Sequence, residues 1–165
     1  MKQKASLLVK SLFGVMTFAL LAPVATTTAR ADAYGPALDL TKPNDGQQVV
    51  SLKKGDTSTS YANYIVGLAQ DPDGINRVTI VIKRLSDSAY WTGNNWISGS
   101  IGFAARLDFM PEPAGTEPRA HAYFDVPNGP PAAGITAGVN YLIQVEAVDL
   151  VGNRTLKSIT IVGVD

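Results

Sequence analysis

Apolar residues recur at every second position along several stretches of this 165-residue chain, and this period constrains its fold more than any other feature. In residues 76–84 the shared face carries Val78, Ile80 and Ile82. In residues 141–149 it carries Tyr141, Ile143, Val145 and Ala147. A strand alternates its side chains between two faces, whereas a helix repeats them every 3.6 residues. Because no sustained helical period follows residue 31, the alternation predicts an all-β domain.

Short segments rich in Asp, Pro, Gly and Asn separate the strongest strands. QDPDG occupies residues 70–74 and DLVGN occupies residues 149–153. These residue types supply local side-chain hydrogen bonds or positive φ angles in turns. We therefore expect each segment to close an antiparallel corner.

About seven short strands, each with one apolar face, predict two antiparallel sheets packed face to face as a β-sandwich. A small closed barrel is the alternative. Residues 110–138 are rich in Pro, Gly and Ala, and proline is excluded from most central strand positions. This stretch predicts long surface loops, interrupted by one strand at residues 120–126.

The first 31 residues have the features of a secretory signal peptide. A basic start precedes the apolar run of residues 12–22, and Ala29 and Ala31 are small residues at the positions that signal peptidase inspects. The run is shorter than the about 20 residues of a membrane-spanning helix. We expect cleavage after Ala31 and a secreted or periplasmic domain at residues 32–165, with an uncleaved N-terminal anchor as the alternative.

Charge and cysteine content exclude several classes of function. Four of the 14 basic residues lie in the signal segment, whereas all 14 acidic residues follow it, which leaves 10 − 14, a net charge of −4. A negative balance argues against nucleic acid or an anionic membrane surface as the partner. The chain has no cysteine, so disulfides, thiolate metal sites and lipoprotein anchors are excluded.

Three phrases together resemble a known family of modules. They are IVGLAQDPDGINRVTIVIKR, YWTGNNW and YLIQVEAVDLVGN. They are similar to the immunoglobulin-like and fibronectin type III-like modules of bacterial extracellular proteins. The resemblance implies an immunoglobulin-like sandwich of about seven strands, with Tyr141 as a buried tyrosine-corner residue bonded to nearby backbone. It implies little about function, since such sandwiches have many unrelated roles.

The aromatic hairpin, residues 90–96, is the first candidate site. Its ligand-binding candidates are Tyr90, Trp91, Asn94, Asn95 and Trp96. As a sugar platform it would need at least one flat, exposed ring with polar neighbours. The alternative is a structural role, in which the two indoles pack on each other across a tight turn and stabilise the hairpin.

The second candidate site is acidic. In an immunoglobulin-like sandwich the two Asp-rich corners lie at one end, which would bring Asp71 and Asp73 near Asp149 and Asn153. Oxygen ligands from two loops are suited to calcium, which takes six to eight oxygens. The alternative is that each Asp only caps its own turn through local backbone bonds. Apart from this calcium site, we expect no cofactor.

The sequence contains few candidate catalytic residues and no common catalytic motif. His121 is the only histidine and lies in an alternating strand, and no G-x-S-x-G, H-E-x-x-H or P-loop motif is present. The sequence therefore predicts a non-catalytic binding or scaffold module that contacts another protein of the cell envelope through loops or edge strands. The alternatives are a carbohydrate-binding module that uses the aromatic hairpin to hold polysaccharide and, less favoured, a small hydrolase.

Overall fold

The computed structural model describes residues 33–55 and 63–165, and the predicted signal peptide lies outside these residues. The described part is all-β, with one short 3-10 helix, η1, at Ala132–Gly134. No helix in it is long and apolar enough to cross a membrane. The eleven strands are β1 (Ala37–Lys42), β2 (Gln48–Val49), β3 (Val66–Gln70), β4 (Ile75–Arg84), β5 (Ala89–Trp91), β6 (Trp96–Ile97), β7 (Phe103–Ala104), β8 (Arg106–Phe109), β9 (His121–Asp125), β10 (Asn140–Asp149) and β11 (Arg154–Gly163).

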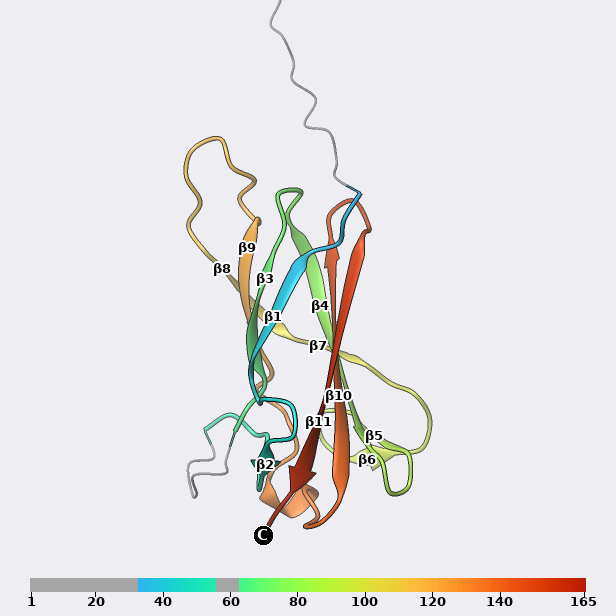
Figure 1. Ribbon diagram of the computed structural model, residues 1–165. Coiled ribbons are helices and arrows are strands. Elements are labelled where there is room, and N and C mark those ends of the chain that lie inside the picture. Colours follow the sequence, from blue (N-terminus) through green and yellow to red (C-terminus); the bar gives the residue numbers. More distant parts are fainter. Residues whose placement is uncertain (1–32, 56–62) are drawn as a thin grey trace, which may run out of the picture. The chain divides into compact units, whose positions relative to one another are not determined.

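The strands form two sheets (Figure 1). The four-stranded sheet has the order β1-β3-β9-β8. The seven-stranded sheet has the order β2-β11-β10-β4-β5-β6, with β7 paired to β4. The strand β10 is central because it pairs with β11 on one side and β4 on the other over nearly its whole length.

The two sheets contain more strands than expected, and one pairing and one connection also differ from the sequence-based expectation. Four of the eleven described strands have two or three residues, and the remaining 11 − 4 = 7 are longer, which is the number expected. One pairing, β11 with β2, is parallel. The DLVGN turn joins the antiparallel pair β10 and β11 as predicted, but the QDPDG turn joins β3 to β4, which belong to different sheets. The local turn signal does not reveal which sheet the next strand enters.

The alternating residues of both sheets form one hydrophobic core. Tyr141, Ile143, Val145 and Ala147 of β10 are all 0% exposed, as the period-two pattern predicts. The same cluster contains residues of the four-stranded sheet, including Leu40, Ala69 and Phe124. Burial of apolar surface contributes about 25 cal/mol per Å². The core between the two sheets therefore supplies the main stabilisation of the domain.

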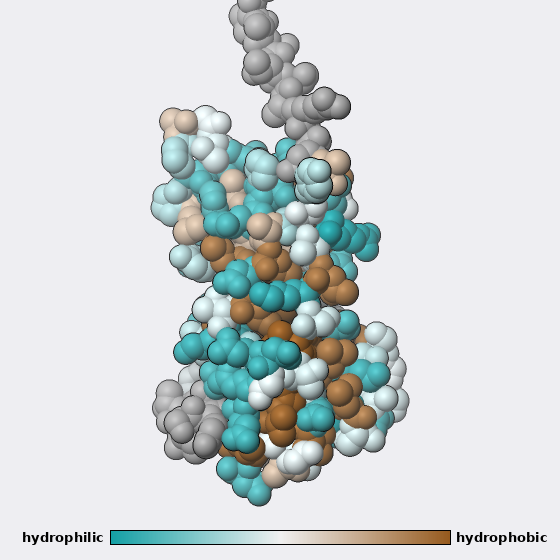
Figure 2. All heavy atoms as spheres, viewed as in Figure 1, coloured by the Kyte–Doolittle hydropathy of each residue, from teal (hydrophilic) through white to brown (hydrophobic). Residues whose placement is uncertain are grey.

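The edges of the two sheets approach each other where β1 lies beside β11 in Figure 1. Hydrophobic residues gather in the middle and lower part of this face (Figure 2). Polar contacts cross the same region: Lys157 Nζ lies 3.4 Å from Asp39 Oδ1, and Asp45 Oδ1 accepts a 2.7 Å bond from the Thr160 backbone N–H. Gly46 N–H also donates to the Thr160 carbonyl. These contacts occupy part of the outer edge of β11, which reduces its tendency to pair with another chain.

Gly67 of β3 lies where neighbouring groups leave no room for a side chain. A Cβ atom there would lie 2.1 Å from the Asp39 carbonyl oxygen and 2.4 Å from the Phe124 ring. We expect Gly67→Ala to lower the free energy of unfolding by about 2 kcal/mol or more, because backbone and ring must both move. Urea unfolding measures this. Gly134→Ala is the matched control, because the nearest described atom to its new Cβ, Pro130 Cβ, would lie 3.4 Å away. This variant should change stability little, and equal effects at both positions would contradict the packing argument.

Candidate functional site

The aromatic hairpin brings its two tryptophans together directly. Trp91 on β5 and Trp96 on β6 are cross-strand partners. Their ring centroids lie 5.3 Å apart in an edge-to-face arrangement. Such a pair contributes about 0.5–1.5 kcal/mol beyond the burial of its surface. Tyr90 pairs with Ile97 instead, and the alternation of β5 places its side chain on the opposite face from Trp91.

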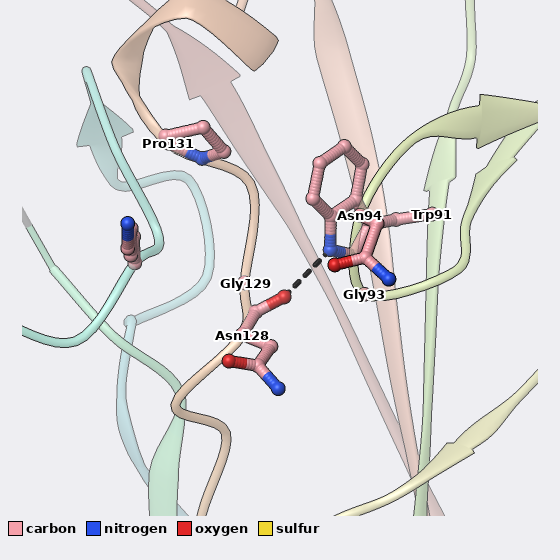
Figure 3. Close-up of a pocket in the computed structure, with 7 residues that line it drawn as sticks. Trp91, Gly93, Asn94, Asn128, Gly129 and Pro131 are labelled. Carbon is pink, nitrogen blue, oxygen red and sulfur yellow. Dashed lines mark hydrogen bonds between the residues drawn. The ribbon is translucent and has the colours of Figure 1, made fainter.

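Both indole N–H groups bond to backbone carbonyls outside the hairpin. Trp91 Nε1 donates to the Asn128 carbonyl at 2.7 Å, and Trp96 Nε1 donates to the Gly134 carbonyl at 2.9 Å. Figure 3 shows the indole of Trp91 directed at the segment that carries Asn128. The hollow beside it has a volume of about 220 Å³ and is also lined by Asn94. This is below the roughly 300–1,000 Å³ of most small-molecule sites.

Other side chains cover the rings. Trp91 is only 4% exposed. Trp96 has Tyr141 at 5.6 Å and the Arg84 guanidinium at 4.8 Å from its centroid. Arg84 is held there by two bonds to Asp87, and these bonds lower the pKa of the Asp87 carboxyl to about 2. Neither tryptophan therefore offers the flat, open ring that a sugar platform needs.

The two asparagines of the hairpin have different surroundings. Asn95 is engaged inside the loop, where its Oδ1 accepts a 2.6 Å bond from the Thr92 hydroxyl. Asn94 is exposed and lines the hollow beside Trp91. Of the five residues named from sequence, only Trp91 and Asn94 line this hollow. The arrangement favours the structural role for the hairpin.

We expect Trp96→Ala to lower the free energy of unfolding by about 2 kcal/mol or more, because it removes a half-buried ring with three neighbours and the bond to Gly134. Thermal melting followed by circular dichroism measures the loss. Tyr90→Ala removes an aromatic ring from the other face of the same hairpin and is the control, with a smaller expected loss. A Trp96→Ala protein as stable as wild type would exclude the structural role.

The acidic corners do meet. Asp71 and Asp73, which follow β3, and Asp149, at the end of β10, each place a carboxylate oxygen within 4.8 Å of the others. A bond of 2.9 Å from the Leu150 N–H to the Gly74 carbonyl connects the two turns. Unit charges about 5 Å apart repel by about 3 kcal/mol at an effective dielectric constant of about 20. Three charged carboxylates in this arrangement therefore repel one another.

Among the residues that the structure describes, only one of the two Asp149 oxygens has hydrogen-bond partners. Its Oδ1 accepts backbone N–H bonds from Val151, Gly152 and Asn153, at 2.9, 2.5 and 2.8 Å. Gly152 has φ +101°, a conformation that glycine adopts without strain. Asp149 is 0% exposed, and its Oδ2 has no hydrogen-bond partner in residues 33–55 and 63–165. Asn153 closes this turn through its backbone, since its carbonyl also accepts the Asp149 N–H.

Sequence reasoning did not find a third surface, on the outer face of the four-stranded sheet. We call it the Tyr123 patch; it consists of Lys54, Val66, Arg106, Asp108, Tyr123 and Asp125. Tyr123 of β9 is 51% exposed and lies between Leu68 of β3 and Asp108 of β8. These residues surround a hollow of about 230 Å³. The only available sequence signal was an aromatic residue on the polar side of an alternating strand.

Asp125 organises the cations of this patch. Its Oδ2 accepts bonds from Lys54 Nζ and, at 2.5 Å, from Arg106 Nη2. Burial raises the pKa of the Asp125 carboxyl, but the bonds from Lys54 and Arg106 outweigh this effect and hold the pKa below its usual value. The Arg106 side chain stays 62% exposed. One carboxylate therefore fixes two cations while leaving much of the guanidinium open to solvent.

We expect the contribution of Asp125 to stability to depend on pH. Because its pKa is lowered in the folded state, the contribution is present above the usual Asp value of 3.8 and is lost as the pH falls through the lower, folded-state pKa. Asp125→Asn should destabilise the protein by about 1 kcal/mol at pH 7, a modest value because Arg106 is exposed. Urea unfolding at pH 7 and at successively lower pH should show the stabilities of wild type and Asp125→Asn converging. Asp108→Asn, which removes a carboxylate from an exposed neighbour, should change stability little at pH 7. A difference between wild type and Asp125→Asn that does not narrow as the pH falls would contradict the assignment.

His121 is paired rather than free. Its Nδ1 lies 2.7 Å from Oε1 of Glu112, whose side chain is mostly buried. No nucleophilic side chain is bonded to the ring among the described residues. The pair therefore holds the loop before β9 against that strand.

Comparisons with protein-family models, with curated proteins and with solved structures found no match to this chain.

Proposed function

We propose that this chain is an exported, immunoglobulin-like β-sandwich that acts as a non-catalytic binding module and contacts another protein through the Tyr123 patch. The strand orders β1-β3-β9-β8 and β2-β11-β10-β4-β5-β6 support the sandwich, because the buried faces of both sheets contribute to one core. The buried ring of Tyr141, whose hydroxyl accepts a 2.7 Å bond from the Thr136 N–H, supports the immunoglobulin-like assignment.

The observation that carries the binding role is the half-exposed Tyr123 ring beside a prearranged Arg106. Tyrosine and arginine are enriched at the energetic centres of protein interfaces. Binding costs less when the side chains involved are already ordered, and Asp125 orders both Lys54 and Arg106. The hollow is too small for most small-molecule ligands but suits an inserted side chain.

The open donors of Arg106 indicate the chemistry of the partner. Only Nη2 of the guanidinium bonds to Asp125, and the group carries five N–H donors in a planar fork. A carboxylate or a backbone carbonyl of the partner would accept from the remaining donors. We therefore propose a partner that places an acidic or extended polypeptide segment on this sheet face.

Polysaccharide binding is the second candidate. It is favoured only by the exposed ring of Tyr123 with polar neighbours at Arg106 and Asp108, since both hairpin tryptophans are covered. Tyr123 thus replaces Trp91 and Trp96 as the ring to test. A small hydrolase has no arrangement of side chains among the described residues that favours it.

The test is capture of envelope proteins on immobilised wild-type protein and on Tyr123→Ala and Arg106→Glu variants. We expect one specific protein to be retained by the wild type and retained at least about tenfold less by either variant, since such anchors contribute about 2 kcal/mol. Leu156→Ala is the matched control, because Leu156 is an exposed hydrophobic residue on the other sheet.

Retention that is unchanged by both variants would refute the Tyr123 patch as the binding surface. All variants must melt like the wild type, so that lost binding is not lost folding. Retention of the wild type on polysaccharide columns, abolished by Tyr123→Ala, would instead support the second candidate.

A further inference from the structure

We propose that Asp71, Asp73 and Asp149 bind a calcium ion that joins the β3–β4 turn to the β10–β11 turn. This inference does not depend on the Tyr123 patch, which is formed by other residues. It depends on two separate observations: the convergence of three carboxylates within 4.8 Å and the buried, unpartnered Oδ2 of Asp149.

The position of the acids follows from the alternation of the strands. Tyr141, Ile143, Val145 and Ala147 point inward along β10, and Asp149 is the next residue in that series. Likewise Asp71 continues the inward series of Ile65, Gly67 and Ala69, and it is only 4% exposed. The strands β3 and β10 thus lead into neighbouring turns, and each has a carboxylate, Asp71 or Asp149, on its buried face at that end. A turn that needed only a cap could use a carboxylate at the surface, whereas these two are removed from water.

The two carboxylate oxygens of Asp149 differ in their hydrogen bonding. Oδ1 receives three backbone N–H bonds and accounts fully for the turn. Oδ2 receives none, and no ion pair among the described residues involves Asp149. A buried carboxylate oxygen without a donor is costly to desolvate. A cation held between this oxygen and the two neighbouring carboxylates would compensate both the burial and the repulsion.

The donor set indicates calcium. All the candidate ligands are hard carboxylate oxygens, whereas zinc and later transition metals favour nitrogen or sulfur ligands. Calcium accepts six to eight oxygens in flexible geometry and can complete its shell with backbone carbonyls and water. Magnesium requires a near-ideal octahedron, which two separate turns are less suited to provide.

The first test is the melting temperature of purified protein after removal of metal with a chelator. We expect about 5 mM calcium chloride to raise it by about 5 °C or more, because an ion that binds only the folded state stabilises that state. Sodium chloride at the same ionic strength is the control for screening. A calcium effect no larger than the sodium effect would overturn the proposal, and an equal effect of magnesium would overturn the assignment to calcium.

The second test uses isosteric variants that keep the turns. Asp149→Asn retains Oδ1 for the three backbone bonds and replaces the unpartnered Oδ2 with an amide. Asp73→Asn removes one carboxylate while keeping its backbone N–H, which donates to Asp71 Oδ1 at 2.8 Å. We expect both variants to fold without metal, to lose the calcium-dependent rise in melting temperature and to lose bound ⁴⁵Ca in equilibrium dialysis, where wild type should hold one ion.

Asp39→Asn is the control, because it removes the same charge from an exposed side chain on β1. It should keep the full calcium response. If Asp73→Asn and Asp149→Asn respond to calcium as the wild type does, the ion binds elsewhere and the proposal is wrong. If either variant does not fold without metal, the other one and the dialysis of wild type decide the question.

Discussion

The strand β10 is the element on which the rest of the structure depends. It is hydrogen-bonded on both sides, and its inward residues Tyr141, Ile143, Val145 and Ala147 are fully buried. A central strand of this kind fixes the register of β4 and β11, because a slip of one residue would turn its whole apolar face outward. Both sites that the sequence suggested lie at its ends.

At its beginning, Tyr141 joins two loops that are distant in sequence. Its hydroxyl accepts a bond from Thr136, and its ring lies 5.6 Å from Trp96 of the aromatic hairpin. At the other end, Asp149 closes the turn to β11 and approaches the turn after β3. Residues at the two ends of β10 therefore contact both the aromatic hairpin and the acidic corners.

The sequence predicted what depends on local order and missed what depends on distant partners. Alternation identified the long strands and the buried faces of β4 and β10, and the burial of Tyr141 with its backbone bond was also expected correctly. The sequence could not show that Trp91 and Trp96 donate to the backbone carbonyls of Asn128 and Gly134, because those residues lie more than 35 positions later in the chain. Nor could it identify the Tyr123 patch, whose two cations, Lys54 and Arg106, are more than 50 positions apart in the chain.

The acidic corners show why one residue pattern can support two interpretations that do not exclude each other. The sequence offers turn capping and metal binding as alternatives for Asp149, yet a carboxylate has two oxygens and about four acceptor sites. Its Oδ1 satisfies the turn, and this bonding orients Oδ2 toward the buried side without giving it a donor. An Asp that only capped the turn would gain nothing from the burial of its second oxygen. The same inward alternation that makes β10 a core strand also places this acid out of contact with water, so its position on the strand carries more information than its place in a turn motif.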